Sequence, residues 1–529
     1  MGKVYLLDCT LRDGGYVNDW MFGAETIRQF SRKIALTGIE LYEVGFIKGD
    51  AYDPDRAVFP DVASIGPMIS PKADNLVYVA MLDMSAPVPI ERIPPRDGTS
   101  VDGLRVIFKK SKIREAYAYC EKIKELGYML FVQFVGTDEY SDKDFIETIE
   151  YFNSLHPYCV SIVDSFGLMK RKQFSRLVSL ADNNLAEGIV LGYHAHNNLQ
   201  QAFSNAEAMV EMNLRRDVCI DACVFGMGRG AGNLNLELFA EYMNENYGAG
   251  YRIEPMLEIL DEYLNDIYKE RFWGYSLPLY LSATHGCHPN YAIYLAEKDS
   301  LTVKSFHELL KSLPPEEKRN FTKERAENAY RNYQESFFDD RDTLKKLTDE
   351  IGGRDVLLLA PGKSLVSRRE EILSFIKKRR PVVVCVNFRG EEFSPDYIFS
   401  SNMRRYIKIG GRTVSKTIVT SNMHEAENYA YKINFGSYTS EAPVIRDNSG
   451  VMALKLLSVL GTGNIFIAGM DGYTVNNGGN YFEQVLEYDF ADEIQARNAA
   501  IAKEIKLLRQ KKTIIFLTPT LYETDCGCP

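Results

Sequence analysis

"KVYLLDCTLRDG", residues 3–14, is a short apolar run that ends in an arginine, an aspartate and a glycine. A buried strand requires apolar side chains, so Arg12 and Asp13 at its carboxyl end, followed by a glycine turn, indicate a functional site. The same theme, a β-branched apolar run followed by a longer stretch of helical periodicity, recurs to about residue 230.

Eight such runs are present. After the first come "IELYEVGF", "LVYVAMLD", "GLRVIFKK", "MLFVQFVG", "CVSIVDSFG", "IVLGYHAHNN" and "VCIDACVFGMG". Eight strands alternating with helices predict an α/β fold, a (β/α)8 TIM barrel over residues 1–233, whose active site lies at the carboxyl ends of the strands. A doubly wound open sheet is the alternative, but it usually has fewer strands before a domain ends.

The remainder of the 529-residue chain is too long to share one core with this barrel. Residues 234–350 are charged and helical in pattern, which predicts a helical extension. Within it, the span 275–294 is rich in Tyr, His and Pro and could fold back toward the barrel mouth. Residues 351–529 open with "IGGRDVLLLAPGKSL" and predict a second α/β, Rossmann-like domain with a mostly parallel, covered sheet.

The composition excludes several classes of partner. The net charge of -10 gives no support for binding to nucleic acid or to an anionic membrane, because both attract a basic surface. No leader segment and no apolar stretch of membrane-spanning length is found in the sequence. The nine cysteines, an odd number scattered over a large chain, predict reduced thiols and a cytoplasmic location.

"HAHNN", residues 194–198, is the most informative motif. Alternate residues of a strand share a face, so His194 and His196 both point into the barrel. With Asp13 they form a two-histidine, one-carboxylate set of metal ligands. The structural alternative is a pair of histidines in a polar core network.

Arg12, beside Asp13, supplies the fixed positive charge that a carboxylate or enolate oxygen requires. Its structural alternative is a salt bridge to Asp8 or Glu43. A divalent ion and an arginine at one oxyanion suit the making or breaking of a carbon–carbon bond through an enolate.

"TLRDG", "HAHNN" and "GMGRGAGN", in this order on the first, seventh and eighth strands, resemble the DRE-TIM metallolyases, the barrels of the HMG-CoA lyase type. The likeness is greatest to the 4-hydroxy-2-oxovalerate aldolases and covers roughly residues 1–295. It implies a divalent ion, Mn²⁺ or Mg²⁺, bound by Asp13, His194 and His196, with Asn233 as a further ligand.

The resemblance also implies substrate contacts. Arg12 would hold a 2-oxo acid and stabilise the pyruvate enolate, with Asp13 and His194 beside it. Ser165 of "VDSFG" matches a serine that contacts the substrate carboxylate, and Tyr280 of "LYLS" is similar to a tyrosine that reaches into the site, with spacing off by one residue.

One position departs from the aldolases. They carry a histidine, the base for the 4-hydroxyl group, three residues after the metal aspartate, where this chain has Tyr16. A tyrosine with a pKa near 10 is a poor base unless a cation lowers that pKa. His285 and His288 of "THGCHPNY" are the other candidate acid–base residues, and a loop held by imidazole hydrogen bonds is their structural alternative.

The second domain resembles, more loosely, Rossmann-like domains of the pterin pyrophosphokinase and bacterial sialyltransferase types. The likeness rests on "LLLAPGKSL", "PDYIFSSN", "DNSGVMALKLLSVLG" and "IFIAGMDGY". It implies a pocket for a nucleotide or nucleotide-sugar, with backbone amides of the glycine turn near a phosphate. A bare strand-to-helix turn and a purely structural sheet are the alternatives. The candidate binding residues are Gly362, Ser364, Asn387, Ser401, Asn402, Ser449 and Asp471.

The leading hypothesis is therefore a class II, metal-dependent aldolase that acts on a 2-oxo acid and an aldehyde. Its fusion to a nucleotide-sugar site suggests surface-sugar biosynthesis, and we expect a homo-oligomer. One alternative is an acyl-CoA-using lyase or condensing enzyme. Another is a catalytically silent barrel that serves as a scaffold for the transferase-like domain.

Overall fold

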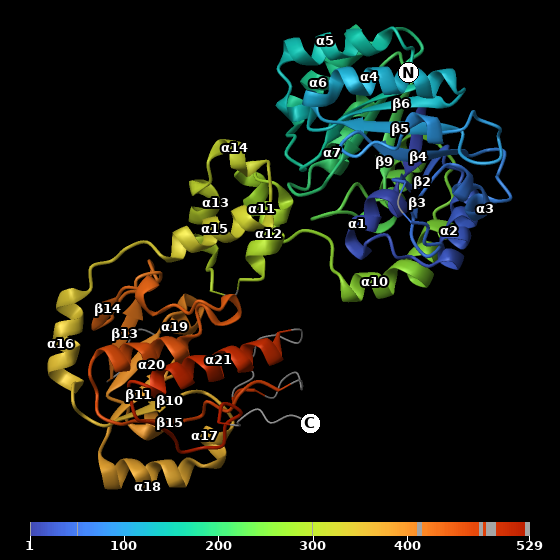
Figure 1. The fold of residues 1–529 in the computed structure, drawn as a ribbon. Helices are drawn as coiled ribbons and strands as arrows, with labels where there is room; N and C mark the ends of the chain where they lie inside the picture. Colours follow the sequence, from blue (N-terminus) through green and yellow to red (C-terminus); the bar gives the residue numbers. More distant parts are fainter. Residues whose placement is uncertain are drawn as a thin grey trace. The chain divides into compact units, whose positions relative to one another are not determined.

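The computed structural model describes residues 2–49, 51–298, 300–409, 415–474, 480–482 and 493–523. The chain forms two compact units (Figure 1). The barrel unit comprises Met1–Tyr294 and Pro314–Phe321, and the second unit comprises Leu295–Leu313 and Thr322–Pro529. The segment 234–350, expected from the sequence to be one helical extension, is thus divided between the two units.

Eight parallel strands close the barrel, because the first strand pairs with both the second and the last. This confirms the fold predicted from the eight apolar runs. A two-residue strand, β3 (Val58–Phe59), adds to the edge of β2 and was not expected. The barrel strands are β1 (Val4–Asp8), β2 (Leu41–Ile47), β4 (Val77–Asp83), β5 (Gly103–Phe108), β6 (Met129–Phe134), β7 (Cys159–Asp164), β8 (Val190–Ala195) and β9 (Val218–Ala222).

Amphipathic helices surround the strands and bury their apolar faces against them. They are α2 (Ala24–Leu36), α4 (Ile113–Glu125), α5 (Asp142–Asn153), α6 (Arg171–Asn184), α7 (Ala202–Glu211) and α8 (Leu236–Tyr247). Shorter helices complete the unit: α1 (Gly15–Asn18), α3 (Gly66–Ile69), α9 (Glu254–Ile259), α10 (Asn265–Glu270), α11 (Leu277–Thr284), α12 (Pro289–Ala296, its last residues in the second unit) and α14 (Pro315–Lys318).

The inside of the barrel is layered. One apolar layer joins residues from seven strands: Leu7, Leu41, Val79, Phe131, Cys159, Val190 and Cys219. Because alternate residues of a strand share a face, the inward residues two positions further along carry the next layer. That layer includes Glu43, Gln133, Ser161 and Asp221, all buried. The barrel therefore has an apolar floor beneath a polar, charged layer near the carboxyl ends of its strands.

Two glycines explain the tight loops at these strand ends. A Cβ on Gly15 would lie 2.0 Å from the ring of Trp20, whose Nε1 donates a 2.7 Å hydrogen bond to the carbonyl oxygen of Arg12. Gly232, in the loop after β9, has a φ of +80°, and a Cβ there would lie 2.0 Å from the carbonyl oxygen of Gly226. Glycine is required at both positions because any side chain would displace the turn.

The end of the span 275–294 packs on the barrel beyond β7. The His288 ring centroid lies 5.0 Å from that of Phe166, and the His288 amide donates to the carbonyl of Lys318 at 2.7 Å. Arg319 then pairs with Asp138 at 2.6 Å and with Glu139 at 2.7 Å. These contacts place His288 and the 314–321 segment beside the loops that follow β6 and β7.

The second unit contains a parallel sheet with strand order β14-β13-β12-β11-β10-β15-β16. The parallel sheet predicted for this part of the chain is confirmed, and the three-residue strand β14 was not expected. Because β10 comes first in the sequence and has β11 on one side and β15 on the other, the direction in which successive strands are added to the sheet reverses beside β10, which makes a topological switch point. The strands are β10 (Val356–Leu359), β11 (Val382–Val386), β12 (Tyr397–Ser400), β13 (Lys416–Thr420), β14 (Tyr431–Ile433), β15 (Ile465–Ala468) and β16 (Ile514–Phe516).

Helices cover both faces of this sheet. Val356 and Leu358 of β10 share one core with α16 (Arg341–Ile351), α20 (Ser449–Val459) and α21 (Ile494–Arg509). Leu357 and Leu359 face the other core, with α17 (Ser364–Ser367), α18 (Arg369–Arg379) and α19 (Met403–Ile409). Helices α13 (Val303–Ser312) and α15 (Lys323–Gln334) precede the sheet in this unit.

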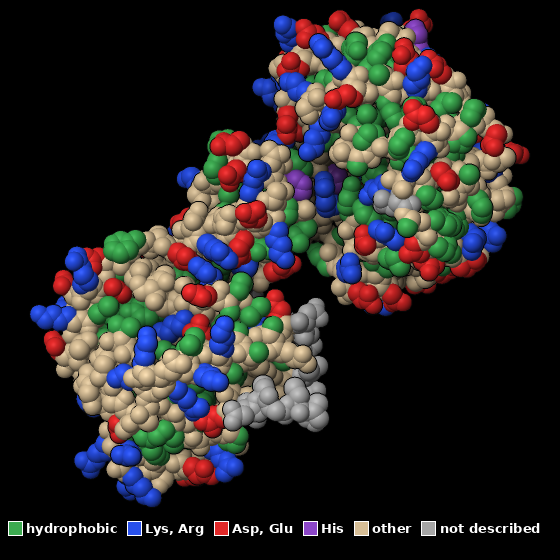
Figure 2. Space-filling model, in the orientation of Figure 1, with side chains coloured by type: hydrophobic (Ala, Val, Ile, Leu, Met, Phe, Trp, Pro, Cys, Tyr) green, Lys and Arg blue, Asp and Glu red, His purple; other side chains and the backbone are tan. Residues whose placement is uncertain are grey.

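Surface and composition agree with a globular chain. Basic and acidic side chains are interspersed over the faces seen in Figure 2. The seven cysteines that the structure describes are all buried and free of disulfides. Across the described residues, no helix combines the length and apolar character needed to cross a bilayer.

Candidate metal centre

Asp13, His194 and His196 meet at the carboxyl end of the barrel. Asp13 lies in the turn after β1, His194 is in β8, and His196 follows that strand. One ligand atom from each lies within 4.8 Å of the others, and all three side chains are buried. The structure therefore brings together the three metal ligands expected from the sequence.

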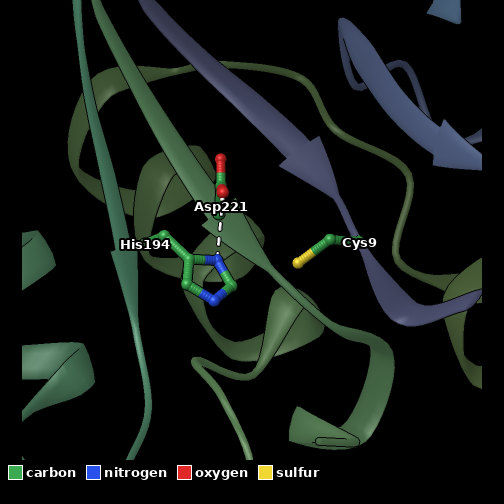
Figure 3. Close-up of side chains that lie close together, drawn as sticks. All are labelled: Cys9, His194 and Asp221. Carbon is green, nitrogen blue, oxygen red and sulfur yellow. Dashed lines mark hydrogen bonds and ion pairs between the residues drawn. The ribbon is translucent and has the colours of Figure 1, made fainter. Parts of the chain in front are cut away.

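His194 is held between two carboxylates. Its Nε2 lies 3.3 Å from Asp13 Oδ2, and its Nδ1 lies 3.0 Å from Asp221 Oδ2 on β9 (Figure 3). Burial lowers the pKa of His194, but hydrogen bonds to these two carboxylates outweigh burial and hold that pKa well above its ordinary value. Asp221 fixes the ring orientation that directs Nε2 toward Asp13.

This histidine belongs to a closed ring of charged side chains, here called the charged ring. Arg12 donates through Nε to Glu43 at 2.7 Å and through Nη1 to Asp13. Arg105 donates through Nη1 to Glu43 at 2.9 Å and through Nη2 to Asp221. The ring runs Asp13, Arg12, Glu43, Arg105, Asp221, His194 and back to Asp13.

The charged ring fixes the ionised form of Asp13. Burial raises the pKa of Asp13, but Arg12 and the two histidines outweigh it and hold that pKa well below the usual range. The ion pair from Arg12 to Glu43, expected as a structural alternative, is present together with the contact to Asp13. Arg12 therefore belongs to the site and to the buried network that supports it.

His196 is ready to bind a cation. Burial lowers its pKa to about 3, so its imidazole is neutral at physiological pH. Its Nε2 lies 3.9 Å from Asp13 Oδ1, too far for a hydrogen bond but within the span of two ligands each about 2.1 Å from one ion. Its buried Nδ1 has no hydrogen-bond partner among the described residues.

Asn233 stands beside these ligands, because its backbone bridges to that of His196. Its Nδ2 donates to Asp13 Oδ1 at 3.0 Å, while its Oδ1 is buried without a partner in the described part of the chain. Turning the amide over would place the oxygen toward Asp13, the arrangement that a metal ligand requires. The unsatisfied Oδ1 and His196 Nδ1 fit a polar site built for a further group.

A second set of possible ligands, Cys9, His194 and Asp221, lies on the Nδ1 side of the same imidazole (Figure 3). Its members are already satisfied within the chain: Cys9 Sγ contacts Cys223 Sγ at 3.5 Å, and Asp221 is paired with Arg105. Burial also raises the pKa of Cys9 well above its ordinary value, which disfavours the thiolate a metal needs. The set around Asp13 is the better candidate.

Tyr16, in α1, packs edge-on against Trp20, with ring centroids 4.8 Å apart. Its pKa is raised above 10, chiefly by burial and then by the charge of Asp13, although Arg229 and Arg12 oppose this. A hydroxyl with a raised pKa is a poor base at neutral pH.

The other expected site residues occupy the rim. Ser165 follows β7, and its Oγ accepts a 2.9 Å hydrogen bond from the Gly136 amide. His288 stacks near Phe166, and burial, followed by Arg229 and Lys109, lowers its pKa to about 3. His285 ends α11 and is half-buried, and Tyr280 is 39% exposed with its ring near Tyr275. Roles for these residues stay predictions.

Sequence reasoning missed three residues that organise the site: Arg105, Asp221 and Arg229. Arg105 and Asp221 are single charges inside otherwise apolar strands, and that isolation was the available signal. Arg229 is the basic residue of the quoted motif "GMGRGAGN", and it lies with its guanidinium 5.3 Å from the Tyr16 ring centroid.

The second unit contains a cavity of about 680 Å³. It opens at the carboxyl ends of the central strands, where a parallel sheet usually binds its ligand. Asn387, whose φ of +61° is strained, directly follows β11 and donates to Ser449 Oγ at 2.8 Å. Ser401 also bonds this hydroxyl, at 2.6 Å. Five of the expected residues line the cavity: Gly362, Asn387, Asn402, Ser449 and Asp471.

The glycine turn after β10 does not offer free amides at the expected positions. The Gly362 amide donates to the carbonyl of Gly469 at 2.9 Å, and the Ser364 amide donates to Asp471 Oδ2 at 2.7 Å. Both donors are therefore used within the chain, and this part of the turn matches the structural alternative.

Comparison with known proteins addresses the barrel. Residues 99–259 match the HMGL-like family. The resemblance read from the sequence motifs is thereby confirmed. The matched residues include His194, His196 and Asn233, and they begin after Arg12 and Asp13.

Curated relatives agree with this HMGL-like match. A 4-hydroxy-2-oxovalerate aldolase of Desulfitobacterium hafniense is 23% identical over 275 residues, which are 50% of this chain and 79% of the relative. A 2-isopropylmalate synthase of a Synechococcus species is 28% identical over 251 residues, 45% of each chain. The solved HMG-CoA lyase of Brucella melitensis is 18% identical, covers 49% of this chain and 96% of its own, and has a TM-score of 0.41. At 23–28% sequence identity, the barrel is thus similar to the curated aldolase and synthase.

Proposed function

We propose that the barrel unit is a divalent-metal-dependent aldolase or lyase that makes or breaks a carbon–carbon bond through the enolate of a 2-oxo acid such as pyruvate. The convergence of Asp13, His194 and His196 beside Arg12 carries this proposal. The HMGL-like match and the aldolase relatives support the reaction class.

Asp13, His194 and His196 would hold the ion, with the Asn233 amide as a fourth ligand. Mixed carboxylate and imidazole donors suit Mn²⁺. Mg²⁺ is the alternative, bound mainly through the oxygen ligands, which it prefers. A divalent ion here would polarise the 2-oxo group and stabilise negative charge on the enolate oxygen.

Arg12 acts on the same oxygen. Glu43 and Asp13 engage its Nε and Nη1, which fixes the plane of the guanidinium. Its Nη2 then has a defined direction in which to donate to the developing oxyanion. The charged ring holds this arrangement before substrate arrives, so little reorganisation accompanies the reaction.

The test follows the methyl protons of pyruvate by ¹H NMR in D₂O, using the full chain loaded with Mn²⁺ at catalytic concentration. Arg12→Ala and His194→Ala are the variants, and metal binding by each is measured in parallel. Metal-dependent exchange in the wild type, lost in both variants, supports enolate formation. No exchange by a protein that binds metal contradicts it.

The same experiment distinguishes two alternative functions. Exchange into the acyl methyl group of an acetyl thioester, in place of pyruvate, would favour an acyl-CoA-using lyase. Metal binding without exchange into either compound would favour a silent barrel that acts as a scaffold.

For the second unit we propose a nucleotide or nucleotide-sugar site in the 680 Å³ cavity. The position of the cavity at the switch point of the sheet and the strained backbone of Asn387 support a binding site there. The fusion would then suit synthesis of a sugar acid for a surface polysaccharide. A nucleotide present at a hundredfold its Kd should stabilise the full chain by about 2.7 kcal/mol, an effect that Asn387→Ala should reduce. A panel of nucleoside phosphates and nucleotide-sugars that leaves the melting temperature unchanged would contradict the proposal.

A further inference from the structure

Arg229 lies in the loop that joins β9 to Asn233, and its charge is directed into the barrel mouth. Its guanidinium carbon lies 5.3 Å from the Tyr16 ring centroid, and its Nη2 donates to the Ser165 carbonyl at 3.4 Å. Its Nε is buried and has no hydrogen-bond partner among the described residues. The side chain therefore crosses the mouth from the loop after β9 toward the loop after β7.

Other guanidiniums at this end of the barrel are neutralised by carboxylates. Arg12 and Arg105 pair with acidic members of the charged ring, and Arg319 pairs with Asp138 and Glu139. In the described residues, no carboxylate lies within ion-pair distance of Arg229. A half-buried, unpaired guanidinium is costly unless an anion reaches it, so a ligand with a negative group would complete it.

The net charge of the charged ring indicates which negative group of the ligand pairs with Arg229. Its three carboxylates and two guanidiniums leave one net negative charge when its imidazole, His194, is neutral, as a metal ligand is. A divalent cation converts this to one net positive charge, which matches a single enolate oxygen. The charge of Arg229 lies outside the charged ring and remains for a second negative group on the same molecule.

We propose that Arg229 binds the carboxylate of the 2-oxo acid and makes the site selective for free acids over esters, amides and thioesters. This inference rests on the proposed function and deepens it. Ser165 lies beside Arg229, and its Oγ accepts from the Gly136 amide, which leaves the hydroxyl hydrogen to donate to the same carboxylate. The carboxylate is thus bound on the β7 side, while the 2-oxo oxygen faces Arg12.

The test uses two isosteric probes and the Mn²⁺-loaded full chain. Pyruvate carries the carboxylate that Arg229 is proposed to bind, and pyruvamide replaces that carboxylate with a neutral amide. Calorimetric Kd values are measured for the wild type, Arg229→Met, Arg229→Lys and the control Arg319→Met, whose guanidinium is already paired. Manganese affinity is measured for each protein to show that the site is intact.

We expect Arg229→Met to weaken pyruvate binding roughly 10- to 100-fold and to abolish the preference for pyruvate over pyruvamide. Arg229→Lys should retain part of that preference, because it keeps the charge but not the bidentate fork. Arg319→Met should match the wild type. Unchanged pyruvate affinity and preference in Arg229→Met would overturn the assignment, and so would loss of manganese binding, since a carboxylate contact does not hold the ion. Failure of the wild type itself to bind pyruvate would instead overturn the proposed function.

Discussion

Asp221→Asn tests how the charged ring supports the metal centre. Asp221 contacts no substrate position in the proposal, and it acts through His194, whose Nδ1 lies 3.0 Å from its Oδ2. Asparagine keeps the shape of the side chain but removes the negative charge. The variant therefore separates orientation of the imidazole from the packing of β9.

Two effects of different size are expected. Loss of a carboxylate behind a metal-binding histidine typically weakens metal affinity about 10- to 100-fold. The Arg105–Asp221 pair is almost fully buried, with both side chains 1% exposed, so breaking it should also cost about 3–5 kcal/mol of unfolding free energy. In Asp221→Asn the buried Arg105 guanidinium keeps Glu43 as its remaining carboxylate partner. Adding Arg105→Met removes that guanidinium, so it should recover part of the stability but none of the metal affinity.

Manganese affinity is measured by titration calorimetry, and unfolding is followed by tryptophan fluorescence. Both tryptophans of the chain, Trp20 and Trp273, lie in the barrel unit, so the signal reports that unit alone. Asp164→Asn is the matched control, because this buried carboxylate ends the neighbouring strand but accepts hydrogen bonds from the amides of Leu168 and Met169. Wild-type metal affinity in Asp221→Asn would refute the reasoning, as would an equal loss in the control.

Three further predictions concern protonation. Hydrogen bonds to Asp13 and Asp221 raise the pKa of His194 and favour its protonated form in the free protein, so Mn²⁺ binding should release protons and strengthen as pH rises. Equal calorimetric enthalpies in buffers of different ionisation heat would contradict this. Because the pKa of Tyr16 is raised, we expect Tyr16→Phe to slow pyruvate proton exchange by much less than the roughly 10²-fold that a general base supplies. A larger decrease in the exchange rate, measured by NMR, would identify Tyr16 as the base. Glu350 of the second unit bonds to Lys416, Tyr397 and Tyr431, and although burial opposes them, these contacts lower its pKa to about 2. The contribution of the Glu350 carboxylate to stability is present above pH 4.5 and is lost as pH falls toward 2. The difference in unfolding free energy between the wild type and Glu350→Gln, measured by calorimetry, should therefore shrink over that range. A difference that stays constant with pH would show that the charge does not contribute.

Much of the fold could be predicted because buried parallel strands leave a strong local signal. All eight barrel strands coincide with apolar runs, and the polar ends of β1 and β8 mark the site. The short strands β3 and β14 were missed because two or three residues carry no periodicity. Division of the helical segment between two units depends on tertiary packing, which its charged, helical pattern does not encode.

The site was predictable only as far as its motifs extend. Asp13, His194 and His196 stand out because charged or imidazole groups end apolar strands. Arg105 and Asp221 acquire a role only when barrel closure brings β5 and β9 to opposite sides of the same charged layer. The sequence likewise could not show whether the amides of the glycine turn after β10 are free. The Gly362 amide donates to a carbonyl that lies more than a hundred residues away, in the loop after β15.

The identity of the metal ligands is the central claim, and pulsed EPR of the Mn²⁺-loaded chain tests it most directly. We predict nitrogen couplings from two imidazoles in the wild type and from one in His196→Ala, with binding lost in Asp13→Ala. An unchanged spectrum in His196→Ala, or binding that depends on Cys9 rather than on Asp13, would contradict the account.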